Sequence, residues 1–345
     1  MRYSYAVQVV REDGTEVGQV PVRIDWEPAR EWVRLKALER GVPPDEAFLL
    51  DCGFSPVWDS NRGQPWIGGF DGGAAGQDGG PREIFAVGYF GELARGVTKR
   101  LVAEGTLQKG DLIRCHPLAY PELGENAPTH APEPERLGRV SPPRIPVRPR
   151  PLRELMTVNG SGPVATDEPL PVFIPERVLE EAGHLTTAEQ GERETGGVLI
   201  GHLFRDGDEA RLFAEVTAQV PARYTEASSA KLTFTPATWT EVRAAISLRN
   251  RAEMMLGWWH SHPVREWCKD CPPEKQASCA LAQGFLSEDD RLLHRTVFPR
   301  AYSVALVVND IGEGGPTYSL FGWSRGVIEE RSFHRLGKES DARTQ

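Results

Sequence analysis

The ten residues M-M-L-G-W-W-H-S-H-P, from Met254 to Pro263, constrain this chain most strongly. The segment begins as an apolar run typical of a buried strand, and Pro263 ends it because proline has no N–H to donate to a strand ladder. Side chains two residues apart on a strand point to the same face, so His260 and His262 project side by side, about 6–7 Å apart along the strand. Two imidazoles in this arrangement are suited to bind one metal ion. Ser261 faces the opposite side and is given no catalytic role.

A catalytic zinc site needs more than two imidazoles, because zinc in hydrolases usually takes three protein ligands and leaves a fourth position for water. Two other segments offer carboxylates. Glu194 opens E-T-G-G-V-L-I-G, at the mouth of another apolar strand. The sequence S-E-D-D at 287–290 supplies an S-x-x-D, in which Asp290 is a hard oxygen ligand and Ser287 a neighbouring hydroxyl.

Each of these features has a simpler interpretation when it is taken singly. The two histidines are equally compatible with core or surface positions. The pair Ser287 and Asp290 also fits a helix capping box, in which each side chain bonds to the other residue's backbone. Glu194 lies in the charged stretch E-R-E at 192–194, which is typical of a solvated surface. The metal-site interpretation therefore depends on the set occurring together.

The ordered set of these residues resembles the motif of the JAMM (MPN-plus, JAB) metallopeptidases. Along the chain the set is Glu194, His260, His262, Ser287 and Asp290. The resemblance covers roughly residues 171–334. It implies a C-terminal α/β sandwich with one catalytic Zn²⁺ ion held by His260, His262 and Asp290. It further implies that Glu194 takes the proton of the attacking water and gives it to the leaving amine, while Ser287 helps to hold the oxyanion.

The same resemblance implies a substrate class. Members of the family hydrolyse peptide or isopeptide bonds after the C-terminus of ubiquitin and ubiquitin-like proteins, in deconjugation or in precursor processing. The expected partners are a ubiquitin-like protein, its conjugates, and E1-like or E2-like conjugation enzymes. Two alternatives remain open: a peptidase that processes a sulfur-carrier protein, and a non-catalytic MPN scaffold of the kind that lacks metal ligands.

The chain departs from the family pattern between the second histidine and the serine, where an insertion spans residues 264–286. The insertion carries Cys268, Cys271 and Cys279, and C-x-x-C spacing lets two thiolates reach one ion. The segment is thus a candidate for a second, structural Zn²⁺ site. An iron–sulfur cluster and free or redox-active thiols are the alternatives. Candidates for a fourth zinc ligand are His294, His202, Cys115 and His116.

The bulk composition of the 345 residues is that of an ordinary soluble protein, with 39% hydrophobic and 26% charged residues. A net charge of −9 argues against a general nucleic-acid binder. No apolar run approaches the roughly 20 residues of a membrane helix, so no membrane partner is expected. The N-terminus lacks the apolar core of a signal peptide, and the expected location is cytoplasmic.

Composition shifts along the chain indicate an α/β protein with two domains. Residues 1–116 are expected to form a small α+β domain that binds substrate or a partner, and residues 169–336 the JAMM domain. The intervening residues 117–168 are proline-rich and are expected to be a semi-rigid linker. Residues 48–50 are expected to form a strand and the glycine-rich residues 63–81 a mobile loop. The polar residues 337–345 are expected to be a disordered tail.

Overall fold

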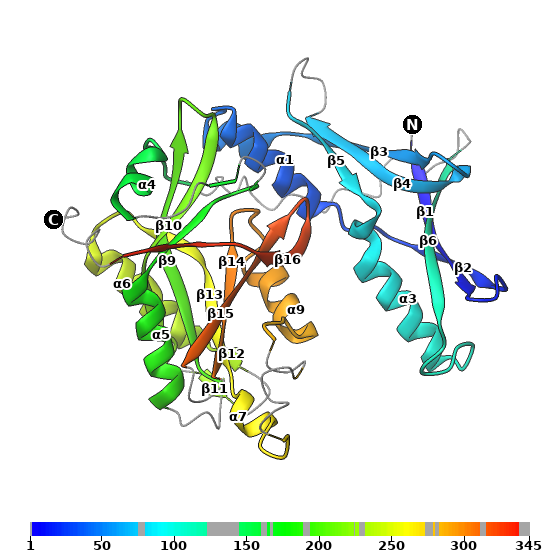
Figure 1. The fold of residues 1–345 in the computed structure, drawn as a ribbon. Coiled ribbons are helices and arrows are strands. Elements are labelled where there is room, and N and C mark those ends of the chain that lie inside the picture. Colours follow the sequence, from blue (N-terminus) through cyan, green and yellow to red (C-terminus); the bar gives the residue numbers. More distant parts are fainter. Residues whose placement is uncertain are drawn as a thin grey trace. The chain divides into compact units, whose positions relative to one another are not determined.

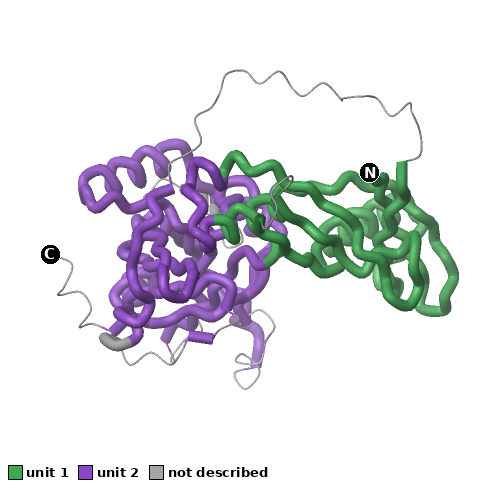
Figure 2. The backbone as a smooth tube through the Cα atoms, turned by 90° about the horizontal axis from the view of Figure 1, so that it is seen from above, with its two compact units in different colours: residues 1–37, 48–143, 325–327 green, residues 38–47, 144–324, 328–345 purple. Residues whose placement is uncertain are grey.

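A computed structural model describes residues 2–74, 80–122, 145–159, 164–165, 168–188, 194–223, 225–227, 232–272, 279, 283–310 and 315–337. The chain divides into two compact units, coloured separately in Figure 2. The first comprises residues 1–37, 48–143 and 325–327, and the second residues 38–47, 144–324 and 328–345. Sheets and helices occur in both, so the fold is α/β as expected. No helix in the described part of the chain is long and apolar enough to cross a membrane.

The first unit contains an antiparallel six-stranded sheet in the order β2-β1-β6-β4-β3, with β5 beside β4. Its strands are β1 (Tyr3–Arg11), β2 (Glu16–Val22), β3 (Cys52–Asp59), β4 (Gly63–Ala74), β5 (Arg82–Ala86) and β6 (Ile113–Pro121). The helices of this half of the chain are α1 (Glu27–Glu39), α2 (Pro44–Leu49), the 3-10 helix η1 (Val87–Phe90) and α3 (Gly91–Ala103). One face of β1 packs Val7 and Val9 against Val97 and Leu101 of α3.

The expectation of a mobile loop over residues 63–81 is wrong for most of that range, since β4 occupies residues 63–74; residues 75–79 lie outside the described part. The glycines of β4 lie where side chains would collide. A Cβ on Gly69 would sit 2.4 Å from the carbonyl oxygen of Phe85, and one on Gly72 would sit 2.5 Å from the ring of Phe54. Glycine here permits a close approach of strands and aromatic rings rather than mobility.

Two other expectations for this half of the chain are corrected. Residues 48 and 49 end helix α2 instead of forming a strand, because Pro44 and the acidic residues Asp45 and Glu46 make a favourable first helical turn. The expected linker 117–168 contains regular structure as well: β6 runs to Pro121, β7 covers Val147–Pro149, and α4 covers Arg153–Asn159. Strand β7 joins the sheet of the second unit beside β9, so the ordered part of that unit begins earlier than residue 169.

The second unit is built on a mixed nine-stranded sheet in the order β16-β15-β14-β13-β9-β10-β8-β17, with β7 beside β9. After β7, its strands are β8 (Val172–Pro175), β9 (Gly196–Asp206), β10 (Arg211–Pro221), β13 (Met254–His262), β14 (Val304–Asp310), β15 (Pro316–Ser324), β16 (Val327–Arg331) and β17 (His334–Leu336). A separate pair comprises β11 (Thr225–Ala227) and β12 (Leu232–Phe234). The helices after α4 are α5 (Glu176–Ala188), α6 (Pro236–Arg249), α7 (Val264–Trp267) and α9 (Glu288–Val297). The expected tail, from residue 338 onward, lies outside the described residues.

Helices cover the two faces of this sheet (Figure 1). On one face, Trp258 of β13 belongs to a core that includes Trp239 of α6 and Leu293 of α9. On the other face, the Tyr318 hydroxyl of β15 donates to the carbonyl oxygen of Leu179 in α5, at 2.9 Å. Because side chains alternate along a strand, the histidines two and four positions after Trp258 share its face, beneath α6 and α9.

Candidate metal centre

The two histidines lie at the end of β13, a central strand with a partner on each side. His260 is in register with Gly196 of β9 and Val307 of β14. Both imidazoles are buried, and their Nε2 atoms are 3.0 Å apart. The Trp258 ring stacks on His260, with a centroid distance of 4.7 Å and an interplanar angle of 15°. The side-by-side arrangement predicted from the H-S-H spacing is therefore confirmed.

Asp290 joins the histidines from the first turn of α9. Its Oδ2 atom is 3.5 Å from Nε2 of His260, and one donor atom from each of Asp290, His260 and His262 lies within 4.8 Å of the others. Ser287 is the N-cap of α9: its backbone N donates to Oδ2 of Asp290 at 2.8 Å, and the backbone N of Asp290 donates to Ser287 Oγ at 3.1 Å. The capping box proposed as a simpler interpretation is therefore present, and it orients the Asp290 carboxylate toward the histidines.

The distances among these donors test whether a zinc ion fits. Zinc binds nitrogen and carboxylate oxygen at about 2.0–2.2 Å, so two donors on one tetrahedral ion lie about 3.3–3.5 Å apart. The observed separations are 3.0 Å between the two Nε2 atoms and 3.5 Å from His260 Nε2 to the Asp290 oxygen. These two separations are close to those expected around one tetrahedral ion, and the donor atoms of His262 and Asp290 lie within 4.8 Å of each other.

The protonation states in this environment favour binding of a cation. The pKa of His262 is lowered to about 3, mainly by burial and also by the neighbouring His260, although Asp290 and a hydrogen bond with Asn309 act in the opposite direction. Burial alone would raise the pKa of Asp290, but the hydrogen bond with His260, the charge of His260 and the hydrogen bonds from Ser287 outweigh burial and lower it. A neutral imidazole and an ionised carboxylate are the ligand forms that a metal ion requires.

Glu194 lies two residues before the first residue of β9 and is buried, which the charged stretch around it did not predict. Its pKa is raised to about 7, mainly by burial; the charge of His260 opposes this rise and that of Asp290 adds to it. A carboxylate in this range is suited to accept and return a proton near neutral pH. Because both His260 and Asp290 act on its charge, Glu194 belongs to the same site without being one of the three grouped ligands.

Ser261 has a positioning role that the sequence did not reveal. Its hydroxyl oxygen accepts a hydrogen bond from the backbone N of Thr195 at 2.9 Å, and its own backbone N donates to the Thr195 carbonyl at 2.8 Å. Thr195 directly follows Glu194, so these two bonds fix the backbone beside that carboxylate. The pairing of β9 with β13 creates the contact, and strand pairing is not readable from the H-S-H motif alone.

The three cysteines of the insertion also come together. The Sγ atoms of Cys268, Cys271 and Cys279 lie within 4.8 Å of one another, and those of Cys268 and Cys279 are 3.6 Å apart. All five cysteines of the chain are described, and none forms a disulfide. The insertion residues 273–278 and 280–282 lie outside the described part.

None of the four residues expected as a fourth ligand joins this group among the described residues. His294 accepts a hydrogen bond from Trp258 Nε1 at 3.1 Å through its Nδ1 atom, within the core under α9. His202 is buried in the interior of β9, opposite Glu215 of β10. Cys115 and His116 lie on β6 of the first unit. Sequence spacing alone did not predict which elements adjoin the insertion.

Two aromatic residues of the insertion pack on a proposed metal ligand. The ring centroids of Trp267 and Phe285 are 5.0 Å and 4.5 Å from that of His262. No sequence motif contains either residue. Their only signal was position, since Trp267 precedes the first cysteine of the insertion and Phe285 comes shortly before Ser287.

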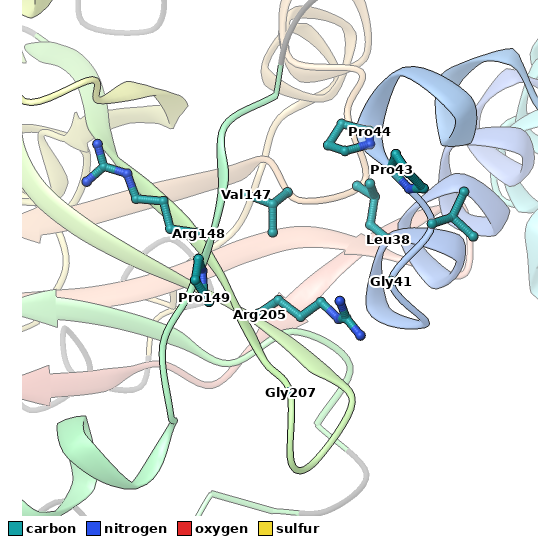
Figure 3. Close-up of a pocket in the computed structure, with 10 residues that line it drawn as sticks. Leu38, Gly41, Pro43, Pro44, Val147, Arg148, Pro149, Arg205 and Gly207 are labelled. Carbon is teal, nitrogen blue, oxygen red and sulfur yellow. The ribbon is translucent and has the colours of Figure 1, made fainter.

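Two hollows lie away from this site. One, of about 220 Å³, is shown in Figure 3 and lies between residues 38–44 and strands β7 and β9 of the second unit. Arg205, which lines it, donates through Nε to the Glu39 carbonyl at 3.2 Å and so anchors that segment. The other is a groove of about 810 Å³ in the first unit, lined by Tyr3, Tyr5 and Trp26 among others. Neither is lined by a residue of the metal centre.

Sequence comparisons with known proteins identify no family for this chain. No protein-family model matches the sequence, and no curated protein matches it either. Among solved structures, the solution structure of protein DSY2949 from Desulfitobacterium hafniense is similar, with 19% identity over 48% of this chain and 92% of its own. The TM-score is 0.32, and a similarity of this size carries no argument about fold or function.

Proposed function

We propose that the second unit is a zinc-dependent peptidase or isopeptidase of the JAMM (MPN-plus, JAB) type, which cuts after the C-terminal residue of a ubiquitin-like protein. The observation that carries the proposal is the convergence of His260, His262 and Asp290 from a strand end and a helix start, with the buried Glu194 beside them. The α/β architecture, with helices on both faces of a mixed sheet, is compatible with an MPN-like sandwich.

The chain's own residues divide the work of binding and proton transfer. His260, His262 and Asp290 would hold the zinc ion at the end of β13. A bound zinc ion supplies Lewis acidity, which makes water acidic near neutral pH and polarises the scissile carbonyl. Glu194 takes the proton from the attacking water and returns it to the nitrogen of the leaving amine, so the carboxylate is restored after each cycle.

Ser287 is placed to donate a hydrogen bond during the reaction. Its Oγ atom accepts the hydrogen bond from the Asp290 backbone N, and its hydroxyl also interacts with the Asp290 carboxylate, so donation elsewhere requires the hydroxyl hydrogen to turn away from that carboxylate. In the proposed reaction this hydrogen is donated to the oxyanion that forms when the carbonyl is attacked. The cap thus fixes the position of the hydroxyl oxygen beside the proposed ligand Asp290.

The test uses the full chain, stripped of metal by a chelator and then reloaded with Zn²⁺. The substrate is a ubiquitin-like protein with a reporter peptide fused to its C-terminus, ideally one encoded beside E1-like and E2-like genes. The proposal predicts zinc-dependent cleavage directly after the last ubiquitin-like residue, located by mass spectrometry. The Glu194→Gln variant should retain zinc but release the reporter far more slowly than wild type.

The same assay separates the alternatives. A zinc-loaded chain that cuts no ubiquitin-like fusion but releases amino acids from a sulfur-carrier protein would support the processing peptidase instead. A chain that binds no zinc at the His260 site and cleaves neither substrate would support the non-catalytic scaffold.

A further inference from the structure

The segment between β13 and α9 contains a cluster that the proposed peptidase reaction does not use. Its three thiols come from positions as far as eleven residues apart, yet the Sγ atoms of Cys268 and Cys279 are only 3.6 Å apart. Two sulfurs bound to one tetrahedral zinc ion at about 2.3 Å each lie about 3.8 Å apart. The observed separation therefore matches a shared ion.

The local backbone explains how the first two thiols come to the same side. The backbone N of Cys268 donates to the Val264 carbonyl at 2.8 Å and so closes the turn of α7. The backbone N of Cys271 then donates to the Cys268 carbonyl at 2.9 Å, which bends the chain back within three residues. A C-x-x-C turn of this kind presents two thiolates to one ion.

Few side chains are fully buried in the described part of this segment. Among the described residues of 264–286, only Val264, Cys268 and Leu286 are buried. Leu286 belongs to the core around Trp258, so it anchors the end of the segment rather than the turn. A bound metal ion can supply folding free energy where so few side chains are buried.

We propose that Cys268, Cys271 and Cys279 bind a second Zn²⁺ ion as thiolates, and that this ion is structural. Thiolates are soft ligands that favour zinc over the oxygen-preferring cations Mg²⁺ and Ca²⁺. Binding releases the three thiol protons to solvent and involves no change of oxidation state. The ion links the turn after α7 directly to Cys279. Without the ion, only the intervening chain connects them.

Because the cysteine cluster lies next to residues that contact His262, the second ion also affects the histidine site. Trp267 directly precedes Cys268, and its ring packs on His262 at 5.0 Å; Phe285 follows Cys279 and packs on the same imidazole at 4.5 Å. An ion on the three thiols therefore holds both arms of the segment against His262. The catalytic meaning of this contact rests on the proposed function, whereas binding of the second ion does not.

Zinc content of the full-length protein tests the proposal, with three variants as comparisons. Wild type should hold about two zinc ions per chain, and the Cys268→Ser/Cys271→Ser double variant about one. The matched control is Cys52→Ser/Cys115→Ser, which changes two cysteines of the first unit and should keep both ions. His260→Ala should lose the ion at the histidine site and keep the thiolate-bound ion. Each site should therefore lose its ion independently of the other.

Cobalt substitution identifies the ligands without reference to activity. Cobalt-loaded His260→Ala should keep an intense near-ultraviolet thiolate-to-cobalt band, and the cysteine double variant should lose it. One zinc ion in wild type that disappears in His260→Ala, with the three thiols reacting freely with a thiol reagent, would overturn the second site. Iron in place of zinc, or a disulfide between Cys268 and Cys279 in the purified protein, would overturn it as well.

Discussion

The two ligand groups of the second unit differ in what holds them in place. His260 and His262 belong to a central strand between β9 and β14, and both are buried. The thiols lie on a turn after the four-residue helix α7, where two of the three cysteines are only half-buried. The sheet therefore positions the first group without an ion, whereas in our proposal the second group depends on an ion for its order. Variants that remove a candidate ligand distinguish a group positioned by the sheet from a group that depends on its ion.

Removing a ligand of the first group should have the largest effect on function and little effect on the fold. Asp290→Asn keeps an oxygen that can accept from the Ser287 backbone N, so the cap survives, but the negative ligand is lost. We expect loss of one zinc ion and of all measurable peptidase activity. Asp289→Asn, an exposed neighbour on the same helical turn, is the control and should behave as wild type. Full zinc occupancy in Asp290→Asn would remove Asp290 from the ligand set.

Replacing Glu194 should separate chemistry from metal binding within the first group. Glu194→Gln keeps the shape of the side chain and removes the proton acceptor, so kcat should fall about 10²–10⁴-fold while zinc content stays unchanged. Zinc analysis and steady-state kinetics on the same preparation measure both. If zinc were lost from a folded Glu194→Gln protein, Glu194 would be a ligand rather than a proton carrier.

Ser287 should show an intermediate effect, because it serves both the helix and the reaction. Ser287→Ala removes the cap of α9, which should cost about 1 kcal/mol of unfolding free energy. Loss of the oxyanion donor should also slow catalysis about 10–1000-fold, with zinc retained. Ser287→Thr keeps the hydroxyl and should restore both properties. Wild-type turnover in the alanine variant would exclude Ser287 from the reaction.

Ser261 should show the smallest effect on turnover, since it acts through the backbone of Thr195. Ser261→Ala leaves the Thr195 N–H without its acceptor, which should cost about 1–3 kcal/mol of stability. We expect kcat to fall about tenfold or less, with KM and zinc content unchanged, because only the placement of Glu194 is relaxed. Ser303→Ala, which also replaces a buried serine, is the control for a purely structural loss. Equal kcat in the two variants would show that Ser261 does not position Glu194.

The candidate site was readable from the sequence where it depends on local geometry. Alternation along a strand places His260 and His262 on one face, and the S-x-x-D spacing predicts the cap that orients Asp290. The burial of Glu194 and the contact of Ser261 with Thr195 depend on which strands pair, and no short motif encodes that pairing. The positions of Trp267 and Phe285 against His262 escaped prediction for the same reason.

The fold shows the same division between local and non-local information. The strong apolar strand pattern that ends in H-S-H-P matches strand β13 of the structure closely. The glycine-rich β4 was misjudged because Gly69 and Gly72 meet a neighbouring strand and an aromatic ring that are distant in sequence. Strand β7 lies in a proline-rich stretch and was not predicted. It forms a strand because it pairs with β9, not because of its composition.

Anomalous X-ray scattering at the zinc absorption edge, from crystals of the full-length protein, tests the account most directly. The account predicts one peak within about 2.2 Å of His260 Nε2, His262 Nε2 and an Asp290 oxygen. It predicts a second peak about 2.3 Å from the sulfurs of Cys268, Cys271 and Cys279. Fully zinc-supplemented crystals with no peak between the two imidazoles would contradict the proposed metallopeptidase centre, whatever the cysteines bind.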